Sequence, residues 1–265
     1  MDRRAFLAAL ATALGGTAAV GVAAGAPAAA GNDPGHAQKA FLRFVERMGC
    51  RRVDADPLVD RNQVANGGLM FSVTEHHLFG RPGLAVLQPC ARISDLVEKG
   101  RFGVLPVFTI AGIAHPNPPS STAGLAMMIS FLTREAGLPL SRLSFTTTRL
   151  RQDDIDLLAS LGVTRIRLRN VREAKALGDG SGWYTSPVSG FSAPTTSVEF
   201  SRGGRTVELG EAIASACCLG LERLRWAMGG AMHTWTEALP AALDAIEEQS
   251  AGRDVPGSAI LAATA

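Results

Sequence analysis

The order of apolar segments along the chain most constrains its fold. Three short apolar runs follow one another without a helical segment between them, at residues 68–73, 84–87 and 104–113. Each run is bounded by Gly, Pro or charged residues, which is typical of strands. Two later runs flank Arg202-Gly203-Gly204-Arg205 and predict a hairpin. Because strands and helices do not alternate strictly, the pattern predicts an α+β fold with an antiparallel or mixed sheet.

Helices are predicted where apolar residues recur with helical spacing. These segments are residues 37–48, 122–136, 153–161, 220–228 and 236–248. The chain has 265 residues, of which 46% are hydrophobic, so a large core is possible. No linker divides the sequence, and one domain over residues 36–250 is the simpler prediction. Residues 1–35 and 251–265 are then a leading segment and a tail.

Charge and cysteine content exclude several classes of protein. The 26 basic and 24 acidic side chains give a net charge of +2, which does not favour a nucleic-acid partner. Four cysteines are too few for a disulfide scaffold of this length. The sequence contains no phosphate-binding P-loop, no HExxH zinc motif and no GxSxG nucleophile motif.

The first 32 residues allow two interpretations. Residues 5–32 carry no charge but are rich in Gly and Ala, so they are a poor membrane anchor and no membrane association is predicted. Asp2-Arg3-Arg4-Ala5-Phe6-Leu7 resembles a twin-arginine export signal, and Ala28-Ala29-Ala30 is a possible cleavage site. The alternative is an ordinary amphipathic helix over residues 3–14. Both cytoplasmic and exported locations therefore stay open, with the cytoplasm favoured by the function considered below.

Two apolar strands end in cysteine, and a predicted helix ends in glutamate. Cys90 follows Gln88-Pro89, Cys217 lies just before a helix, and Glu135 ends Phe131-Leu132-Thr133-Arg134-Glu135. Two thiolates and a carboxylate form a legitimate zinc set with a fourth position left for substrate. Taken one at a time, these residues are also common as core cysteines and surface glutamates. The long sequence separations between Cys90, Glu135 and Cys217 are, by themselves, a weak signal for a shared zinc site.

The most informative string is a strand that runs into Gly220-Leu221-Glu222-Arg223 and then a helix. This order places Arg223 in the first helical turn, where a guanidinium can meet a polyphosphate bidentately. Gly220 permits the close approach of a nucleotide. The same pattern also fits an amphipathic helix whose Glu and Arg are solvated.

Gly220-Leu221-Glu222-Arg223 resembles motif 3 of class II aminoacyl-tRNA synthetase catalytic domains. Within that superfamily the chain is most similar to the amino acid:[carrier protein] ligases, which are related to archaeal-type seryl-tRNA synthetase and lack a tRNA-binding domain. Further segments resemble the motif 1 region, the first zinc-cysteine strand, the family's Phe-x-x-Arg-Glu and the second zinc cysteine, at residues 55–72, 86–90, 131–135 and 216–217. The resemblance implies a class II synthetase-like antiparallel sheet flanked by helices.

The resemblance also implies an activity and a set of site residues. Zinc on Cys90, Glu135 and Cys217 would hold the amino group of a small amino acid such as glycine or alanine. ATP, with magnesium, would convert that amino acid to an aminoacyl-adenylate. The acyl group would then pass to the phosphopantetheine thiol of a carrier protein. The implied catalytic residues are Arg223 and Glu222, and the implied ATP-binding residues are Arg223, Gly220, Arg92 and Phe108. A homodimer around Pro57 is also implied.

One departure from the family is large. Its motif 2 contains Phe-Arg-x-Glu, whose arginine holds the α-phosphate, whereas here Phe108-Thr109-Ile110-Ala111-Gly112 is followed by Ile113-Ala114-His115-Pro116, without the Arg or the Glu. His115 is a weak substitute, and Arg92 or Arg101 is the other available replacement. The loss of that charge costs several kcal/mol of transition-state stabilisation when nothing replaces it, on the order of other such deletions.

Two other interpretations stay open. In an alanyl-tRNA synthetase-like catalytic fragment, Cys90-Ala91-Arg92 would resemble the Cys-x-Arg of motif 2, and Arg92 would hold the α-phosphate. That family places an Asp four residues before its Gly-Leu-Glu-Arg, where this chain has Ala216. The third interpretation is a catalytically degenerate paralogue that acts as a binding protein.

Overall fold

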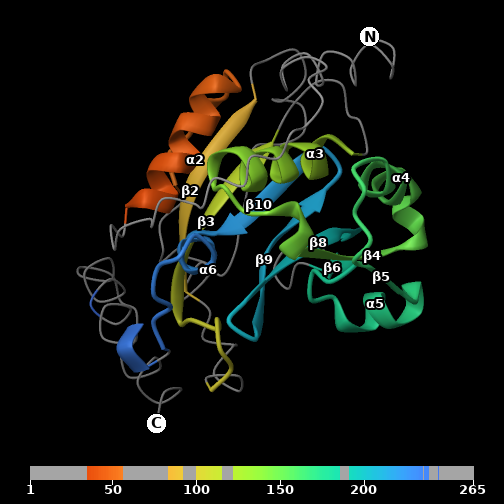
Figure 1. Cartoon of the computed structure of the whole chain (residues 1–265). Helices are drawn as coiled ribbons and strands as arrows, with labels where there is room; N and C mark the ends of the chain where they lie inside the picture. The colour runs from red at the N-terminus through yellow and green to blue at the C-terminus, as the bar shows by residue number, and fades with distance from the viewer. Residues whose placement is uncertain are drawn as a thin grey trace.

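An eight-stranded sheet forms the centre of the molecule in the computed structural model (Figure 1). The structure describes residues 35–55, 83–91, 100–114, 122–185, 191–234, 236–238 and 244. The sheet order is β1-β2-β3-β10-β9-β8-β4-β5, and β6 and β7 form a separate hairpin. The strands are β1 Arg51–Arg52, β2 Leu84–Ala91, β3 Val107–Ala114, β4 Leu143–Thr148, β5 Ile166–Arg169, β6 Trp183–Thr185, β7 Ser192–Pro194, β8 Thr196–Arg202, β9 Arg205–Ile213 and β10 Ala216–Gly220.

The sheet is mostly antiparallel. Only the pairs at its two edges, β1 with β2 and β4 with β5, are parallel. Each parallel pair is separated in sequence by a long connection, as parallel pairing requires. The observed mixed sheet with helices confirms the predicted α+β class.

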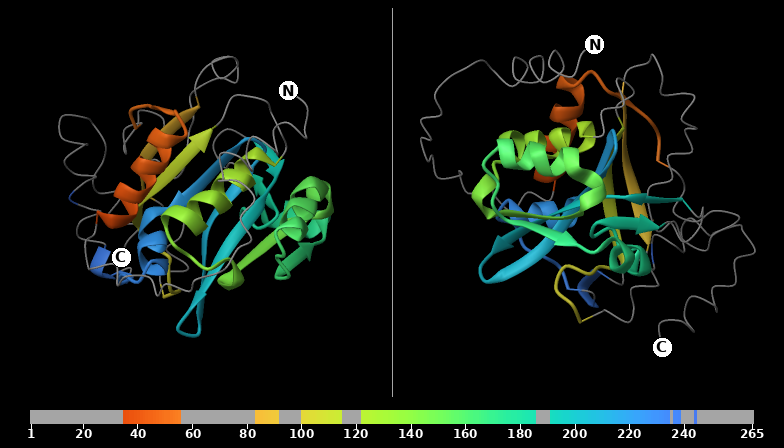
Figure 2. Two further views of the ribbon diagram at one scale, coloured as in Figure 1. Left: turned by 45° about the horizontal axis from the view of Figure 1, so that its top comes forward. Right: turned by 90° about the vertical axis from the view of Figure 1, so that its right-hand side faces the viewer.

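Helices α2, α3 and α6 cover one face of the sheet (Figure 2). The helices and helical turns are α2 His36–Arg47, α3 Ala123–Ser130, η3 Phe131–Glu135, η4 Leu140–Arg142, η5 Arg149–Arg151, α4 Gln152–Ser160, α5 Val171–Leu177 and α6 Leu221–Ala227. The apolar face of α2 buries Ala40, Phe41 and Phe44, and both rings pack against Phe131. The resulting core lies between these helices and the sheet.

The strand register separates the side chains into two faces. Residues directly opposite each other lie on the same face, and neighbours along a strand alternate. One row across the sheet consists of Ala85, Ile113, Cys217 and Ala212, all within the helix-covered core. The adjacent row lies on the opposite face, which we call the polar face, and runs Val86, Gly112, Cys218, Glu211, Ser197, Thr146 and Arg167.

Several predicted elements are confirmed and others need correction. The helix predicted over 37–48, the helix predicted over 153–161 and the hairpin after Thr196 are present. The apolar stretch 212–219 contributes to two strands, because Ala214 has a left-handed φ of 49° and turns the chain between β9 and β10. Strand β4 and helix α5 were not predicted. Strand β4 contains three consecutive polar residues that are all buried, Thr146, Thr147 and Thr148. Its sequence therefore lacks the alternation of apolar and polar residues that predicts a strand.

Several sequence predictions concern residues outside the described part of the chain. These include the possible export signal at residues 1–34, the motif 1-like segment after Ala55 with Pro57, Arg92, and most of the predicted last helix. Among the described residues, no helix is both long and apolar enough to cross a membrane.

Candidate functional site

The Gly-Leu-Glu-Arg segment lies where the central strand β10 meets helix α6. Gly220 has extended backbone angles, with φ −78° and ψ 117°, and α6 begins at Leu221. A Cβ at Gly220 would approach only the side chain of Arg223, at 3.6 Å or more. Packing therefore does not require glycine here, which leaves close ligand approach as a reason for it.

Glu222 joins α6 to the neighbouring strand β3. Both carboxylate oxygens accept a hydrogen bond from the Thr109 backbone N–H, each at 3.0 Å. Burial raises the pKa of the Glu222 carboxyl, and the Thr109 hydrogen bonds oppose that shift. Glu222 therefore fixes the Gly-Leu-Glu-Arg segment against strand β3. Its contacts are with Thr109, its own backbone and the charge of Arg225, and the catalytic role assigned from sequence stays a prediction.

Arg223 also contacts the backbone. Its Nε donates to the Gly103 carbonyl at 2.9 Å, and Nη1 donates to the Glu208 carbonyl at 3.2 Å. These bonds tie α6 both to the loop before β3 and to strand β9. The sequence assigned Arg223 to ATP phosphate, whereas the structure gives its guanidinium a bracing role at the same junction.

The two remaining ATP-binding predictions are Phe108 and Arg92, and only Phe108 lies within the described residues. Phe108 is half-buried on β3 and lies opposite Cys90. Arg92 follows the last residue of β2, Ala91, and lies outside the described residues. Strand β3 therefore carries Phe108 beside β10, the strand that leads to Gly220.

The predicted zinc ligands Cys90 and Cys217 do not meet. Cys90 is level with Phe108 on β3, whereas Cys217 is level with Ile113. Five residues along a strand span about 17 Å, and an odd offset places the two side chains on opposite faces. Two thiolates on one zinc each lie about 2.3 Å from the metal, so this separation cannot form the predicted set.

Glu135 lies at the end of the helical segment that follows α3. Gly124, at the other end of this segment, contacts the start of β10, and Glu135 lies eleven residues farther along, roughly 15 Å from Gly124. Its carboxylate forms an ion pair with Arg47 of α2. The ligand set Cys90, Glu135 and Cys217 is therefore corrected, and these residues do not fit a zinc ion. Within the described ranges, no group of three metal-ligating side chains is present.

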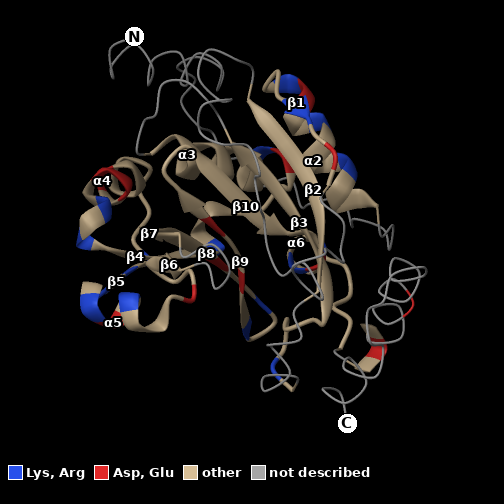
Figure 3. Cartoon of the chain, turned by 180° about the vertical axis from the view of Figure 1, so that it is seen from behind, with Lys and Arg blue, Asp and Glu red and all other residues tan. Residues whose placement is uncertain are grey.

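The polar face carries acidic residues that sequence reasoning missed. Glu211 lies directly opposite Cys218, and its Oε1 is 3.9 Å from the Cys218 Sγ. Burial raises the pKa of the Cys218 thiol well above its ordinary value, and the charges of Glu211 and Glu208 act in the same direction. Two carboxylates therefore make this part of the face electronegative (Figure 3). Both residues lie in strand β9, where they alternate with the buried residues Val207, Leu209 and Ala212, and this alternation is the signal that could have found them.

A tight loop contacts Glu211 from the side. Gly180 has a φ of 89°, and a Cβ at this residue would lie 2.5 Å from the Glu211 Oε2. Thr195 fixes the loop by donating a hydrogen bond from its hydroxyl to the Gly180 carbonyl. The Thr147 hydroxyl donates in turn to the Thr195 carbonyl at 3.0 Å. Buried polar contacts thus hold the loop against the acidic part of the polar face.

Comparison with models of known protein families gives no match for this chain, and a search of curated proteins gives none. The function proposed below is therefore argued from the side-chain geometry and the short motifs.

The buried Cys217 thiol makes stability depend on alkaline pH. Burial raises the pKa of Cys217 from 9.0 to about 12, with a smaller contribution from Cys50. The unfolded chain ionises first, so stability is complete below pH 9 and falls as the pH rises toward 12. We expect the unfolding free energy of wild type minus that of Cys217→Ala to fall by about 2–3 kcal/mol from pH 8 to 11, measured by urea denaturation. Parallel pH profiles of the two proteins would contradict this expectation.

Proposed function

We propose that this protein activates a small amino acid with ATP on the polar face and transfers the acyl group to the phosphopantetheine thiol of a carrier protein. One observation carries the proposal. The strand β3, where the resembled family carries motif 2, is the neighbour of β10, which leads into the segment that resembles motif 3, and the Glu222 carboxylate joins them through Thr109. A class II synthetase-like arrangement is further supported by a mostly antiparallel sheet that has helices α2, α3 and α6 on one face.

The electronegative part of the polar face suits the substrate's ammonium group. The carboxylates of Glu211 and Glu208 lie close enough to raise the pKa of the Cys218 thiol, and the same field attracts a cation. In the resembled ligases, zinc holds this amine. Because the predicted zinc ligands do not converge here, we assign amine binding to Glu211. A carboxylate accepts the hydrogen bonds that an ammonium donates, and such charged hydrogen bonds are strong.

The proposed reaction has two steps. In the first, a carboxylate oxygen of the amino acid attacks the α-phosphorus of ATP, and the bond from that phosphorus to the bridging oxygen breaks, releasing pyrophosphate. In the second, the acceptor's thiolate sulfur attacks the acyl carbon, and AMP leaves with the electrons of the acyl–oxygen bond. Gly220 supplies space for the nucleotide, while Glu222 and Arg223 hold the surrounding backbone. The protein's contribution is mainly the positioning of the reactants.

Amino-acid-dependent exchange between ATP and pyrophosphate tests the proposal. We expect wild type to catalyse exchange with glycine or alanine. Glu211→Gln should reduce kcat/KM for the amino acid at least about tenfold, since a neutral amide loses a charged hydrogen bond. The matched control is Glu173→Gln, which changes an exposed carboxylate on helix α5, away from strands β9 and β10.

The outcomes of the exchange assay are distinct. Equal activity in Glu211→Gln and wild type would reject Glu211 as the amine ligand. An absence of exchange in folded wild type, with every small amino acid tested, would reject the activity and favour the binding paralogue.

A second candidate is an alanyl-tRNA synthetase-like catalytic fragment. Ala216 stands where that family has an Asp, but Glu211 is its diagonal neighbour on the same face, since Cys218 faces Glu211 and Ala216 faces Ile213. Glu211, on strand β9, can therefore supply a carboxylate beside Ala216, where that family has its Asp. Transfer of the activated amino acid to tRNA, rather than to a carrier thiol, would favour this candidate.

A further inference from the structure

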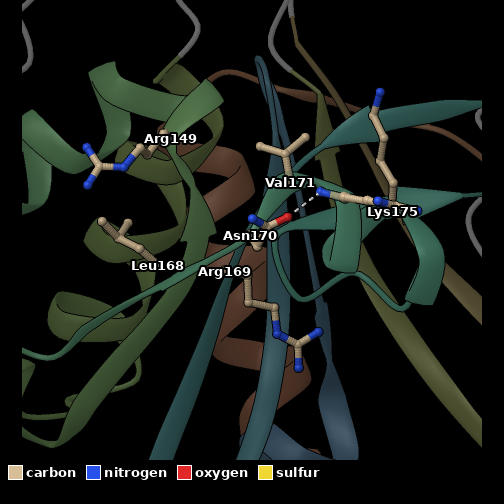
Figure 4. A pocket seen from close by; sticks show the side chains of 7 residues that line it. Arg149, Leu168, Arg169, Asn170, Val171 and Lys175 are labelled. Carbon is tan, nitrogen blue, oxygen red and sulfur yellow. Dashed lines mark hydrogen bonds between the residues drawn. The ribbon is translucent and has the colours of Figure 1, made fainter.

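A basic pocket lies at the end of edge strand β5, outside the residues used so far. It has a volume of about 720 Å³ and is lined by Arg149, Leu168, Arg169, Asn170, Val171, Arg172 and Lys175. Figure 4 shows Arg149 and Lys175 on opposite sides of Asn170, with Arg169 between and below them. Four of the seven lining residues are cationic, and none of the described lining residues is acidic. This composition favours an anionic ligand.

The four cations have different surroundings. Arg169 forms an ion pair with Asp179 at 3.5 Å, and the Lys175 ammonium lies 4.4 Å from the centre of the Trp183 ring. Arg149 and Arg172 are exposed at the rim. Within the described part of the chain, neither of these two side chains takes part in an ion pair, and both line the pocket. They are therefore suitable for substitution without damage to the fold.

The pocket adjoins the acidic part of the polar face. Asp179 contacts Arg169 in the pocket, and the next residue, Gly180, contacts Glu211. The strand register supports the same proximity, because Arg169 lies on the same face two residues beyond Arg167, and Arg167 and Glu211 belong to one row, three strands apart. Three strand spacings amount to about 14 Å. A ligand with an anionic group in the pocket can thus extend a flexible arm over the loop to the proposed reaction centre.

We propose that this basic pocket binds the phosphate of a phosphopantetheine-type thiol acceptor. The inference rests on the proposed function, which requires such a thiol to reach the acyl group. The phosphate pairs with Arg149 and Arg172, and the pantetheine arm crosses the Asp179–Gly180 loop toward Glu211. The same phosphate chemistry is present in free phosphopantetheine and in the group attached to a carrier protein.

The composition of the pocket favours one phosphate over an RNA backbone. The described lining residues include no aromatic side chain, so the pocket offers no stacking platform for bases. The whole chain has a net charge of only +2, which does not provide an extended basic surface. A compact cluster of four cations instead matches a single dianionic group.

Equilibrium binding tests this pocket without requiring turnover. Isothermal titration calorimetry would compare 4′-phosphopantetheine with pantetheine, which lacks the phosphate. We expect wild type to bind phosphopantetheine at least about tenfold more tightly, and Arg149→Ala/Arg172→Ala to abolish that preference. The control variant Arg51→Ala/Arg52→Ala removes two exposed charges at the opposite edge of the sheet and should retain the preference.

Each result supports or overturns the proposal. Equal binding of the two compounds, or an unchanged preference in Arg149→Ala/Arg172→Ala, would overturn it. Binding of tRNA that depends on the same arginines, without binding of phosphopantetheine, would also overturn it and indicate an RNA acceptor. Holo- and apo-carrier protein then separate the two phosphate sources, because only the holo form carries the group. Pyrophosphate exchange should be unchanged in both double variants, so loss of the pocket is distinguishable from loss of activation.

Discussion

Arg151→Met is expected to lower the free energy of unfolding by about 3–5 kcal/mol, as for other buried ion pairs that lose one partner. The side chains of Arg151 and Asp154 are 7% and 0% exposed, and Nη2 lies 2.7 Å from Oδ2. Burial raises the pKa of Asp154 above its ordinary value, and the charge of Arg151 offsets part of this shift. Removal of the guanidinium leaves a buried carboxylate without its countercharge. Urea denaturation at pH 7 measures the loss.

A double variant and a pH series make this expectation specific. Arg151→Met/Asp154→Leu removes both charges and should be more stable than Arg151→Met, because no uncompensated carboxylate is then buried. In Arg151→Met alone, the folded-state pKa of Asp154 exceeds its unfolded value of 3.8. The folded state therefore binds more protons, and stability falls as the pH rises above 3.8. A loss below about 1 kcal/mol at pH 7 would show that the pair is unimportant.

The second large effect is expected for Gly124→Ala. Gly124 is the second residue of α3, and a Cβ there would lie 2.1 Å from the Ala216 carbonyl oxygen and 2.8 Å from the Ala214 carbonyl oxygen. Both contacts are with backbone, which cannot move aside as a flexible side chain can. The Gly124 N–H also donates to the Ala214 carbonyl at 3.0 Å. We expect a loss of about 3 kcal/mol or more in unfolding free energy, at the upper end of overpacking effects.

The sign of this effect distinguishes packing from helix propensity. Propensity alone predicts that Ala in place of Gly stabilises a helix by about 1 kcal/mol. The control is Gly100→Ala, for which no heavy atom lies within 4 Å of the added Cβ and φ is not left-handed. Calorimetric melting of the three proteins should place Gly124→Ala well below the other two. A melting temperature at or above that of wild type would contradict the close helix–sheet contact.

Local patterns were sufficient for several elements of this fold. The helical spacing of Ala40, Phe41 and Phe44 predicts α2, and the Gly203-Gly204 turn between apolar runs predicts the β8–β9 hairpin. These elements depend on contacts between residues close in sequence, so their signal is present in a short window. Strand β4 lacked that signal, since its threonines are buried by distant parts of the chain, and the Thr147 hydroxyl is hydrogen-bonded to Thr195 and Thr196 about fifty residues away.

The residues of the candidate site also fall into two groups, those that local sequence predicts and those that only the tertiary structure brings together. The sequence by itself determined the residues of the Gly-Leu-Glu-Arg junction and the strand-then-helix order that places Gly220 before α6. Only the tertiary structure decided which side chains share a face. An offset of five residues on β3 separates Cys90 from Cys217, whereas direct pairing brings Glu211 to Cys218. Because side chains alternate along every strand, strand register, which depends on distant parts of the chain, determines which candidate ligands can meet.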